Sequence, residues 1–419
     1  MSDPLALILA LCALAAALAA AVVRARLLPE ALVATLGAVL LVAVDATSVD
    51  EAHAMVSELG STVCFLAALL VLAEGCRREG LFDAIGLLLA ARSRGSARRL
   101  LGLVFAVAAV ITAVLSLDAT VVLLTPIVFV TASRMRTSPK PHVYACSHLA
   151  NSASLLLPVS NLTNLLAFHA SGLSFTRFGA LMALPWLVAL SVEWAVISRF
   201  FGHTGRGSPA AASTPSEQPH WPLYAVAVLA ATLGGFALSS LAGIEPVWIA
   251  AAGAVAITLP ALARRAAAPF EIVRSAEPSF LLFVLALGVI VGTAGGNGLE
   301  SAVQRVLPDG SGLLDLLFIA AACAVLANLV NNLPAILIAL PVVAAAAGPG
   351  PVLAALIGVN VGPNLTYVGS LATLLWRRVL HAEDAEVELG EFSRLGALTV
   401  PVVIGASTFA LWLSLRWFT

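Results

Sequence analysis

The chain has 419 residues, of which 60% are hydrophobic and only 11% are charged, and its formal net charge is -1. Soluble globular domains carry about 25% charged residues, so this composition excludes an ordinary soluble domain and is typical of an integral membrane protein. The sequence contains no GxxxxGK motif, which excludes a P-loop for ATP, and its near-neutral charge argues against a basic surface for nucleic acid.

Apolar segments long enough to cross a bilayer recur along the chain. They lie near residues 4–23, 28–44, 62–76, 100–116, 143–158, 179–198, 221–241, 246–262, 279–294, 312–329, 351–368 and 395–415. The pattern predicts an all-α polytopic membrane protein with about twelve spans.

A polar stretch at the middle of the chain, residues 202–220, is rich in Gly, Ser and Pro and predicts a linker. On each side of it, an apolar run containing proline is followed by a span with a polar interruption. We therefore predict two structural repeats, residues 1–201 and 221–419. Each repeat is expected to hold a re-entrant helical hairpin (116–136 and 330–346) and a broken transmembrane helix (158–164 and 360–370). The prolines expected to break helices are Pro126, Pro158, Pro334 and Pro363.

Amides and hydroxyls crowd the two interruptions, LLPVSNLTNLLA at 156–167 and NVGPNLTYVGSLATLL at 360–375. In hydrocarbon, irregular backbone survives only where it lines a cavity or packs against protein. The ends of broken helices also carry partial charges of about half a unit. The pattern therefore predicts a polar pocket at mid-membrane depth, where the two interruptions face one another.

The residues expected to bind a solute are the polar ones in the hairpins and interruptions. They are Ser116, Asp118, Asn151, Ser160, Asn161, Thr163, Asn164, Asn328, Asn331, Asn332, Asn360, Asn364, Thr366 and Ser370. An alternative stays open for each of them, because Asn and Thr also hold membrane helices together through hydrogen bonds of roughly 0.6 to 2 kcal/mol.

Asp118 is the acid most deeply embedded in apolar sequence, within SLDATVVLLTP. An ionised carboxylate at that depth is costly unless it is paired or hydrated, so we predict that Asp118 exchanges protons during transport. A capping role, in which Asp118 accepts bonds from backbone N–H groups, is the alternative and is compatible with the first. His148, three residues before Asn151, is a second candidate for proton coupling.

Other ionisable residues carry weaker signals. His142 and Cys146, four positions apart, share one helix face, and His148 follows two residues later. Ordinary packing explains these residues better than a metal site, and no metal or cofactor is predicted. An intramembrane aspartyl protease needs two carboxylates, and the second hairpin offers Asn332 instead, so an enzyme is not expected. Glu74 and Glu193 lie near the ends of apolar runs and are predicted to reach the membrane interface.

Four segments resemble the ArsB family of arsenite efflux permeases, within the wider ion transporter superfamily: LDATVVLLTPIV, SLLLPVSNLTNLL, NLVNNLPAILI and GPNLTYVGSLATLLW. The resemblance implies two inverted repeats with substrate bound between hairpin tips and breaks. It also implies a protein of the bacterial cytoplasmic (inner) membrane that exports As(OH)3 or Sb(OH)3 in exchange for protons by alternating access. Implied partners are the metalloid acid, protons and the lipid bilayer, with a soluble ATPase and a homodimer as further partners that the sequence leaves open.

The chain departs from the family pattern at the expected site. Leu117 precedes Asp118 where members often have Asn-Asp, and Asn360 and Asn364 stand where members often have an acidic residue and a lysine. The substrate is therefore open. An H+- or Na+-coupled transporter of another small anion or solute of the superfamily is the main alternative, and a passive channel is a remoter one. Twelve spans would also put an even number of crossings between the hairpins, whereas inversion requires an odd number.

Overall fold

The computed structural model describes residues 3–23, 29–202, 220–346, 348–383, 385 and 387–418, and regular structure within these ranges is entirely helical. The all-α prediction is therefore confirmed. The predicted linker, apart from Gly202 and His220, lies outside the described residues.

The first half of the chain forms nine α-helices. They are α1 (Asp3–Val23), α2 (Glu30–Ala43), α3 (Val49–Arg78), α4 (Leu81–Ser93), α5 (Ala97–Val114), α6 (Thr125–Arg134), α7 (Lys140–Ser152), α8 (Leu162–Ser171) and α9 (Phe175–Phe200). A π-helical segment, Ala119–Leu124, leads into α6, and two 3₁₀ segments, Ala153–Leu156 and Pro158–Ser160, separate α7 from α8.

The second half contains the remaining helices. They are α10 (Leu223–Ala242), α11 (Pro246–Ala263), α12 (Pro269–Ser275), α13 (Pro278–Ala294), α14 (Glu300–Gln304), α15 (Leu313–Val330), α16 (Asn332–Ala344), α17 (Gly350–Val361), α18 (Leu371–Ala382) and α19 (Leu389–Phe418). A π-helical segment, Gly295–Leu299, joins α13 to α14, and 3₁₀ segments Gly362–Leu365 and Tyr367–Gly369 separate α17 from α18.

Eight helical stretches in the described residues are long and apolar enough to cross a membrane. They are Pro4–Ala21, Val49–Arg78, Ala97–Val114, Phe175–Phe200, Pro246–Ala263, Pro269–Gln304, Leu313–Val330 and Leu389–Phe418. Several segments counted among the twelve predicted spans are instead shorter apolar helices, such as Gly350–Leu365. For the predicted spans 143–158 and 351–368, the difference arises because 3₁₀ segments and extended residues end the α-helix before it covers the thickness of a bilayer.

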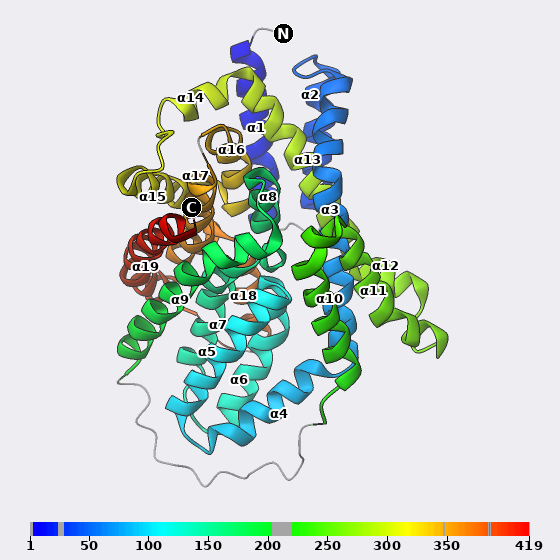
Figure 1. Ribbon diagram of the computed structural model, residues 1–419, viewed down its shortest axis with the longest axis vertical. Coiled ribbons are helices and arrows are strands. Elements are labelled where there is room, and N and C mark those ends of the chain that lie inside the picture. The colour runs from blue at the N-terminus through cyan, green and yellow to red at the C-terminus, as the bar shows by residue number, and fades with distance from the viewer. Residues whose placement is uncertain are drawn as a thin grey trace.

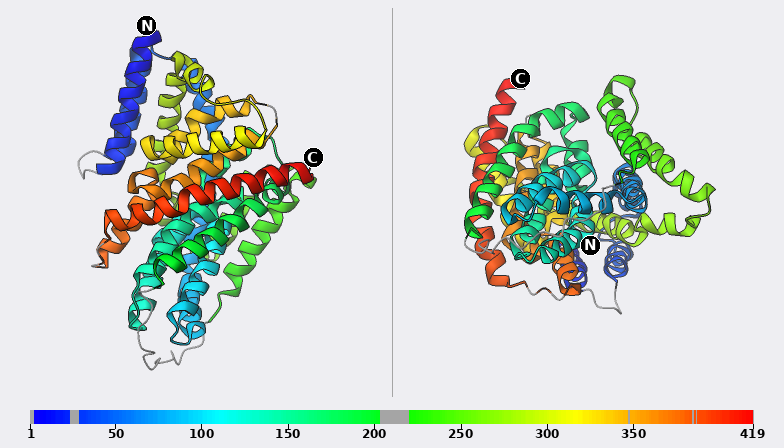
Figure 2. Two further views of the ribbon diagram at one scale, coloured as in Figure 1. Left: turned by 90° about the vertical axis from the view of Figure 1, so that its left-hand side faces the viewer. Right: turned by 90° about the horizontal axis from the view of Figure 1, so that it is seen from below.

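The helices form two sets. In the first, which we call the outer set, α1, α2 and α13 pack together and α3 packs against α11 and α13 (Figure 1). In the second, the inner set, α5 to α9 pack with α15 to α19. The two long helices α9 and α19 run side by side, green and red in Figure 2. The polar interruptions of both halves belong to the inner set.

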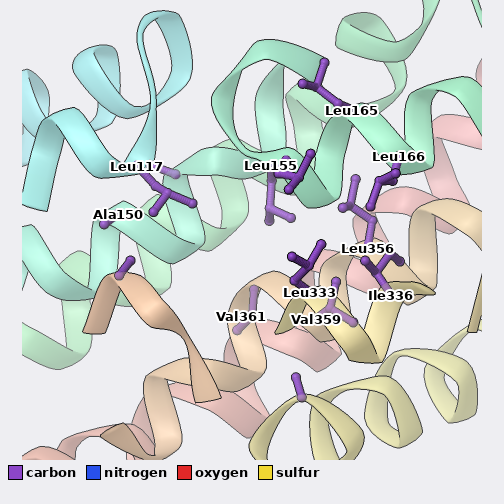
Figure 3. Packing of buried hydrophobic residues seen from close by; sticks show 14 of the residues in the cluster. Leu117, Ala150, Leu155, Leu165, Leu166, Leu333, Ile336, Leu356, Val359 and Val361 are labelled. Atoms are coloured by element: carbon purple, nitrogen blue, oxygen red, sulfur yellow. The ribbon is translucent and has the colours of Figure 1, made fainter. Parts of the chain in front are cut away.

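Apolar contacts join the two halves inside the inner set. Leu166 of α8 lies next to Leu356 of α17 and Ile336 of α16 (Figure 3), and all three side chains are buried. Close van der Waals packing stabilises contacts between membrane helices, so this contact helps to fix how the two interruptions sit relative to one another.

Candidate functional site

The first interruption lies between α7 and α8. After α7 ends at Ser152, two 3₁₀ segments follow, and the residues after each, Leu157 and Asn161, have extended backbone. Pro158 has no N–H and cannot continue a helical ladder. The Asn161 Oδ1 then accepts a hydrogen bond from the Thr163 N–H (3.4 Å) and caps α8.

The second interruption, between α17 and α18, has the same backbone conformation. Its extended residues are Thr366 (φ -137°, ψ 153°) and Ser370 (φ -145°, ψ 141°). Leu157 (φ -125°, ψ 151°) and Asn161 (φ -158°, ψ 151°) stand 209 positions earlier. The Ser370 Oγ caps α18 by accepting a bond from the Ala372 N–H (3.1 Å).

Residues that have the same backbone conformation in the two interruptions are 209 positions apart. Aligning the shared Asn-Leu-Thr motif would pair different residues. The two Asn-Leu-Thr triplets begin at Asn161 and Asn364, but the counterpart of Asn161 is Ser370, and the counterpart of Asn364 is Leu155. The triplets therefore occupy different places in the two interruptions. Asn151 and Asn360, in contrast, are true counterparts, one at the end of each short helix.

The two predicted hairpins begin at short non-helical stretches, Leu115–Ser116 in the first and Asn331 in the second. Ser116 follows α5, and its Oγ accepts a bond from the Ala119 N–H (3.1 Å). Asn331 follows α15 with a left-handed φ of 75°, a strained conformation for a residue other than glycine. Its Nδ2 donates to the Val368 carbonyl oxygen (3.0 Å), which ties the start of α16 to the second interruption. The chain stays helical through both Pro126 and Pro334.

A pocket of about 50 Å³ lies where these four segments meet. Its polar wall comes from Ser116, Asp118, Asn161, Thr163, Asn332 and Ser370, and no described residue that lines it is basic. Its apolar wall includes Leu66, Leu69 and Leu70 of α3 and Phe280 of α13, from the outer set. At about 10–15 Å³ per water, the pocket has room for a solute the size of a few water molecules.

Four other predicted residues lie behind the pocket as an amide cluster: Asn151, Asn164, Asn360 and Asn364, all buried. The Asn360 Nδ2 donates to Asn164 Oδ1 (2.6 Å), and the Asn360 Oδ1 accepts from Thr163 Oγ1 (2.7 Å). On the other side, the Asn151 Nδ2 donates to Asn364 Oδ1 (2.8 Å). Every one of these bonds joins the first half of the chain to the second.

The remaining predicted residues brace the interruptions against neighbouring helices. The Ser160 Oγ donates to the Ala113 carbonyl oxygen of α5 (2.9 Å). The Asn328 Nδ2 donates to the Gly362 carbonyl oxygen (2.8 Å), and its Oδ1 accepts from Thr366 Oγ1 (2.7 Å). These are the helix-joining bonds that the sequence leaves open as an alternative to solute binding.

Glu193 is a polar residue that the sequence interpretation misplaced. It is fully buried, so the prediction that it reaches the membrane interface is wrong. Its Oε2 lies 3.1 Å from His148 Nδ1, and its Oε1 accepts from Ser152 Oγ (2.8 Å) and from Asn364 Nδ2 (3.2 Å). Spacing could have located it, because Glu193 continues the buried stripe of α9 formed by Phe178, Met182, Pro185, Ala189 and Ile197.

The other ionisable residues singled out in the sequence have local partners. Both ring nitrogens of His142 lie within 3.2 Å of backbone carbonyl oxygens, those of Ser138 and Ala97. Glu74 forms ion pairs with Arg77 (2.6 Å) and Arg78 (2.9 Å) at the end of α3. Neither residue contributes to the pocket.

The comparisons with known proteins all match membrane transport proteins. A family model described as citrate transporter matches residues 16–368. The arsenical pump membrane protein of Escherichia coli (strain K12) is 26% identical over 388 residues, covering 88% of this chain and 90% of that protein. An uncharacterized transporter of Mycobacterium tuberculosis is 25% identical over 370 residues, covering 84% and 85%. The solved structure of the Alcanivorax borkumensis YdaH transporter matches with a TM-score of 0.54 and 14% identity, covering 87% of this chain and 88% of that one. The resemblance inferred from the sequence is thus confirmed, as is the expectation of a transporter rather than an enzyme.

Proposed function

Because the chain belongs to the citrate transporter family (CitMHS), we propose that it is a secondary active transporter that exports arsenite or antimonite in exchange for protons. The relatives named arsenical pump membrane protein suggest the substrate. The chemistry of the pocket supports this choice and carries the proposal.

The pocket offers hydroxyls, amides and one carboxyl, and none of its described lining residues is basic. Arsenite at neutral pH is As(OH)3, an uncharged molecule with three hydroxyl groups that both donate and accept hydrogen bonds. Ser, Thr and Asn side chains match such a molecule without any opposite charge. A multiply charged anion would be costly to bury in the same lining without a cation beside it. The small volume also suits a solute of few atoms.

Alternating access follows in this proposal from the two sets of helices. The polar wall of the pocket belongs to the inner set, and the apolar wall of α3 and α13 belongs to the outer set. Movement of one set along the other would expose the polar wall first to one side of the membrane and then to the other. The matching interruptions, 209 residues apart, support the assignment of residues 1–201 and 221–419 as inverted repeats with re-entrant hairpins at 116–136 and 330–346.

Proton coupling is assigned to two groups. The Asp118 carboxyl lines the pocket, where it exchanges its proton with whichever side of the membrane the pocket faces. If the proton and the solute compete for the same pocket, only one of them is bound at a time. The transporter then exchanges them across the membrane and does not carry them together. His148, predicted as the second coupling residue, lies behind the amide cluster.

Transport in everted membrane vesicles tests the proposal. Vesicles from cells that lack their own arsenite exporter should accumulate arsenite when this chain is present and a proton gradient is imposed, and a protonophore should abolish the accumulation. Asp118→Asn should remove the response to the gradient, whereas Asp83→Asn, at an exposed position of α4, should behave as the wild type. Arsenite entry that is passive and unaffected by a protonophore would indicate a channel and contradict the proposal.

A second candidate is an Na+- or H+-coupled carrier of a small organic anion, favoured by the family description. Asp118 with neighbouring hydroxyl and amide oxygens supplies the hard oxygen ligands that a cation needs beside an anionic substrate. Thermal stabilisation of the purified protein by arsenite, antimonite, citrate and dicarboxylates, with and without Na+, separates the two functions, because a ligand stabilises the folded state that binds it.

A further inference from the structure

A second polar centre lies apart from the pocket, where α7, α9 and the second interruption meet. His148 and Glu193 are fully buried there, with Nδ1 and Oε2 3.1 Å apart. Neither residue lines the pocket. The other side chains bonded to the Glu193 carboxyl, those of Ser152 and Asn364, are both neutral.

The contact between two such groups requires a proton between them. With one dissociable proton the pair has a net charge of -1, and with two it is neutral, wherever the second proton sits. A net charge buried among neutral partners is unfavourable unless it is hydrated. We propose that the His148–Glu193 pair is a proton-binding site, and that its loading is coupled to the solute pocket through the Asn364 segment.

The coupling runs through a single side chain of the second half. The Asn364 Nδ2 lies within hydrogen-bonding distance of Glu193 Oε1 (3.2 Å), Ser152 Oγ (3.0 Å) and the His148 carbonyl oxygen (3.1 Å). Asn364 belongs to the first 3₁₀ segment of the second interruption, Gly362–Leu365, and Ser370, at the end of the same interruption, is part of the polar wall of the pocket. Loss of the proton from the His148–Glu193 pair leaves a buried negative charge. Water can reach this charge only if the Asn364 segment moves away from the pair. The position of Ser370 then changes with the protonation of the pair.

Unpartnered polar atoms mark where water reaches the centre. In the described part of the chain, His148 Nε2, Asn151 Oδ1 and Tyr367 OH are buried without a hydrogen-bond partner. The rings of His148 and Tyr367 both contact the Phe392 ring, with centroids 5.6 Å and 4.5 Å away. Buried polar atoms are normally satisfied by protein or by water, so in this proposal water beside these atoms carries the proton to and from the pair.

Other titratable and charged groups stand on the elements packed around the pair. They are Lys140, His142, Tyr144 and Cys146 on α7, Arg98 and Arg99 on α5, Asp118 next to the π-helical segment, Arg134 on α6, Arg177 and Arg199 on α9, Tyr367 in the second interruption, Arg377, Arg378 and His381 on α18, and Glu391, Arg394 and Arg416 on α19. Glu391 accepts bonds from Lys140 (2.8 Å) and Tyr144 (3.4 Å), so it is already engaged away from the pair.

The first test detects the proton without any substrate. Infrared difference spectra of the reconstituted protein between two pH values should contain carboxyl or imidazole bands that are absent in Glu193→Gln and altered in His148→Gln. Glutamine keeps the acceptor for Ser152 and Asn364, so the variant is expected to fold, and a thermal melt checks this. The bands should persist in Glu277→Gln, at an exposed position, and in Asp118→Asn. Spectra of Glu193→Gln identical to those of the wild type would overturn the proposal.

The second test concerns coupling and rests on the proposed function. In vesicles, Glu193→Gln should lose about ten-fold of the stimulation by a pH gradient, a typical size for coupling between sites, while arsenite-for-arsenite exchange at equal pH persists. Full stimulation in Glu193→Gln would overturn the coupling. If the wild type does not transport arsenite but the infrared bands behave as expected, the substrate assignment fails and the proton site stands.

Discussion

Removal of the Asn360 side chain should lower the free energy of unfolding, and the size of the loss follows from the hydrogen bonds of that side chain. The side chain of Asn360 bonds with Asn164 (2.6 Å), Thr163 (2.7 Å) and Asn161 (3.3 Å), all across the boundary between the halves. Hydrogen bonds between membrane helices contribute about 0.6 kcal/mol on average and up to about 1.7 kcal/mol. Asn360→Ala should therefore lower the free energy of unfolding by about 2–5 kcal/mol.

A double-mutant cycle isolates one of these bonds. Unfolding of Asn360→Ala, Asn164→Ala and the double variant in mixed micelles should give a coupling energy of about 0.6–1.7 kcal/mol for the Asn360–Asn164 bond. Ser301→Ala, at an exposed position of α14, should change stability by less than about 0.5 kcal/mol. Additive losses for the pair, within about 0.5 kcal/mol, would refute the assignment of a direct bond between the halves.

Three further outcomes are expected. Gly396→Ala should cost about 1–3 kcal/mol of stability, because an added Cβ at Gly396 meets the Asn364 carbonyl oxygen and the Leu365 Cα. The Cβ added by Gly405→Ala on the same helix meets nothing within 4 Å, so that variant should cost little. Asn332→Leu should weaken arsenite binding about ten-fold, equal to about 1.4 kcal/mol, as measured by the arsenite concentration that half-maximally stabilises the protein. Exchange of neutral As(OH)3 for a proton moves charge, so a potassium diffusion potential of 100 mV should drive export with about 2.3 kcal/mol per charge; export indifferent to the potential would contradict the exchange of a neutral solute.

Hydropathy and proline positions predict the class of fold and the regions of interest. Composition was sufficient to identify an all-α membrane protein, and Pro158 and Pro363 lie in the non-α-helical stretches of the two halves. The described residues contain eight long spans where twelve were predicted, in part because hydropathy continues through the 3₁₀ segments after α7 and α17, whose backbone is no longer α-helical. Asn164 and Thr163 illustrate the same limit at the site: they are neighbours in sequence, yet Thr163 lines the pocket and Asn164 does not.

Which polar residues face the pocket depends on contacts between distant parts of the chain. Asn151 and Asn364 are 213 positions apart, and no local pattern indicates that they bond. The shared Asn-Leu-Thr triplet was misleading for the same reason, since conformation and not residue identity defines counterparts in the two interruptions. Glu193 was misplaced because its sequence position, near the end of an apolar run, is also typical of a lipid-facing residue that reaches the interface.

The two interruptions share a backbone conformation but differ in their titratable residues, and each fact bears on the proposed mechanism. In the proposed repeat scaffold the two conformations have similar energies. The proton gradient gives the direction of transport, and it acts through the groups that bind protons. Asp118 belongs to the first hairpin, and His148 has the buried Ile357 as its counterpart 209 positions later. The titratable groups therefore concentrate in the first half, and their protonation can favour one conformation over the other by as much as their interaction energies differ between the two.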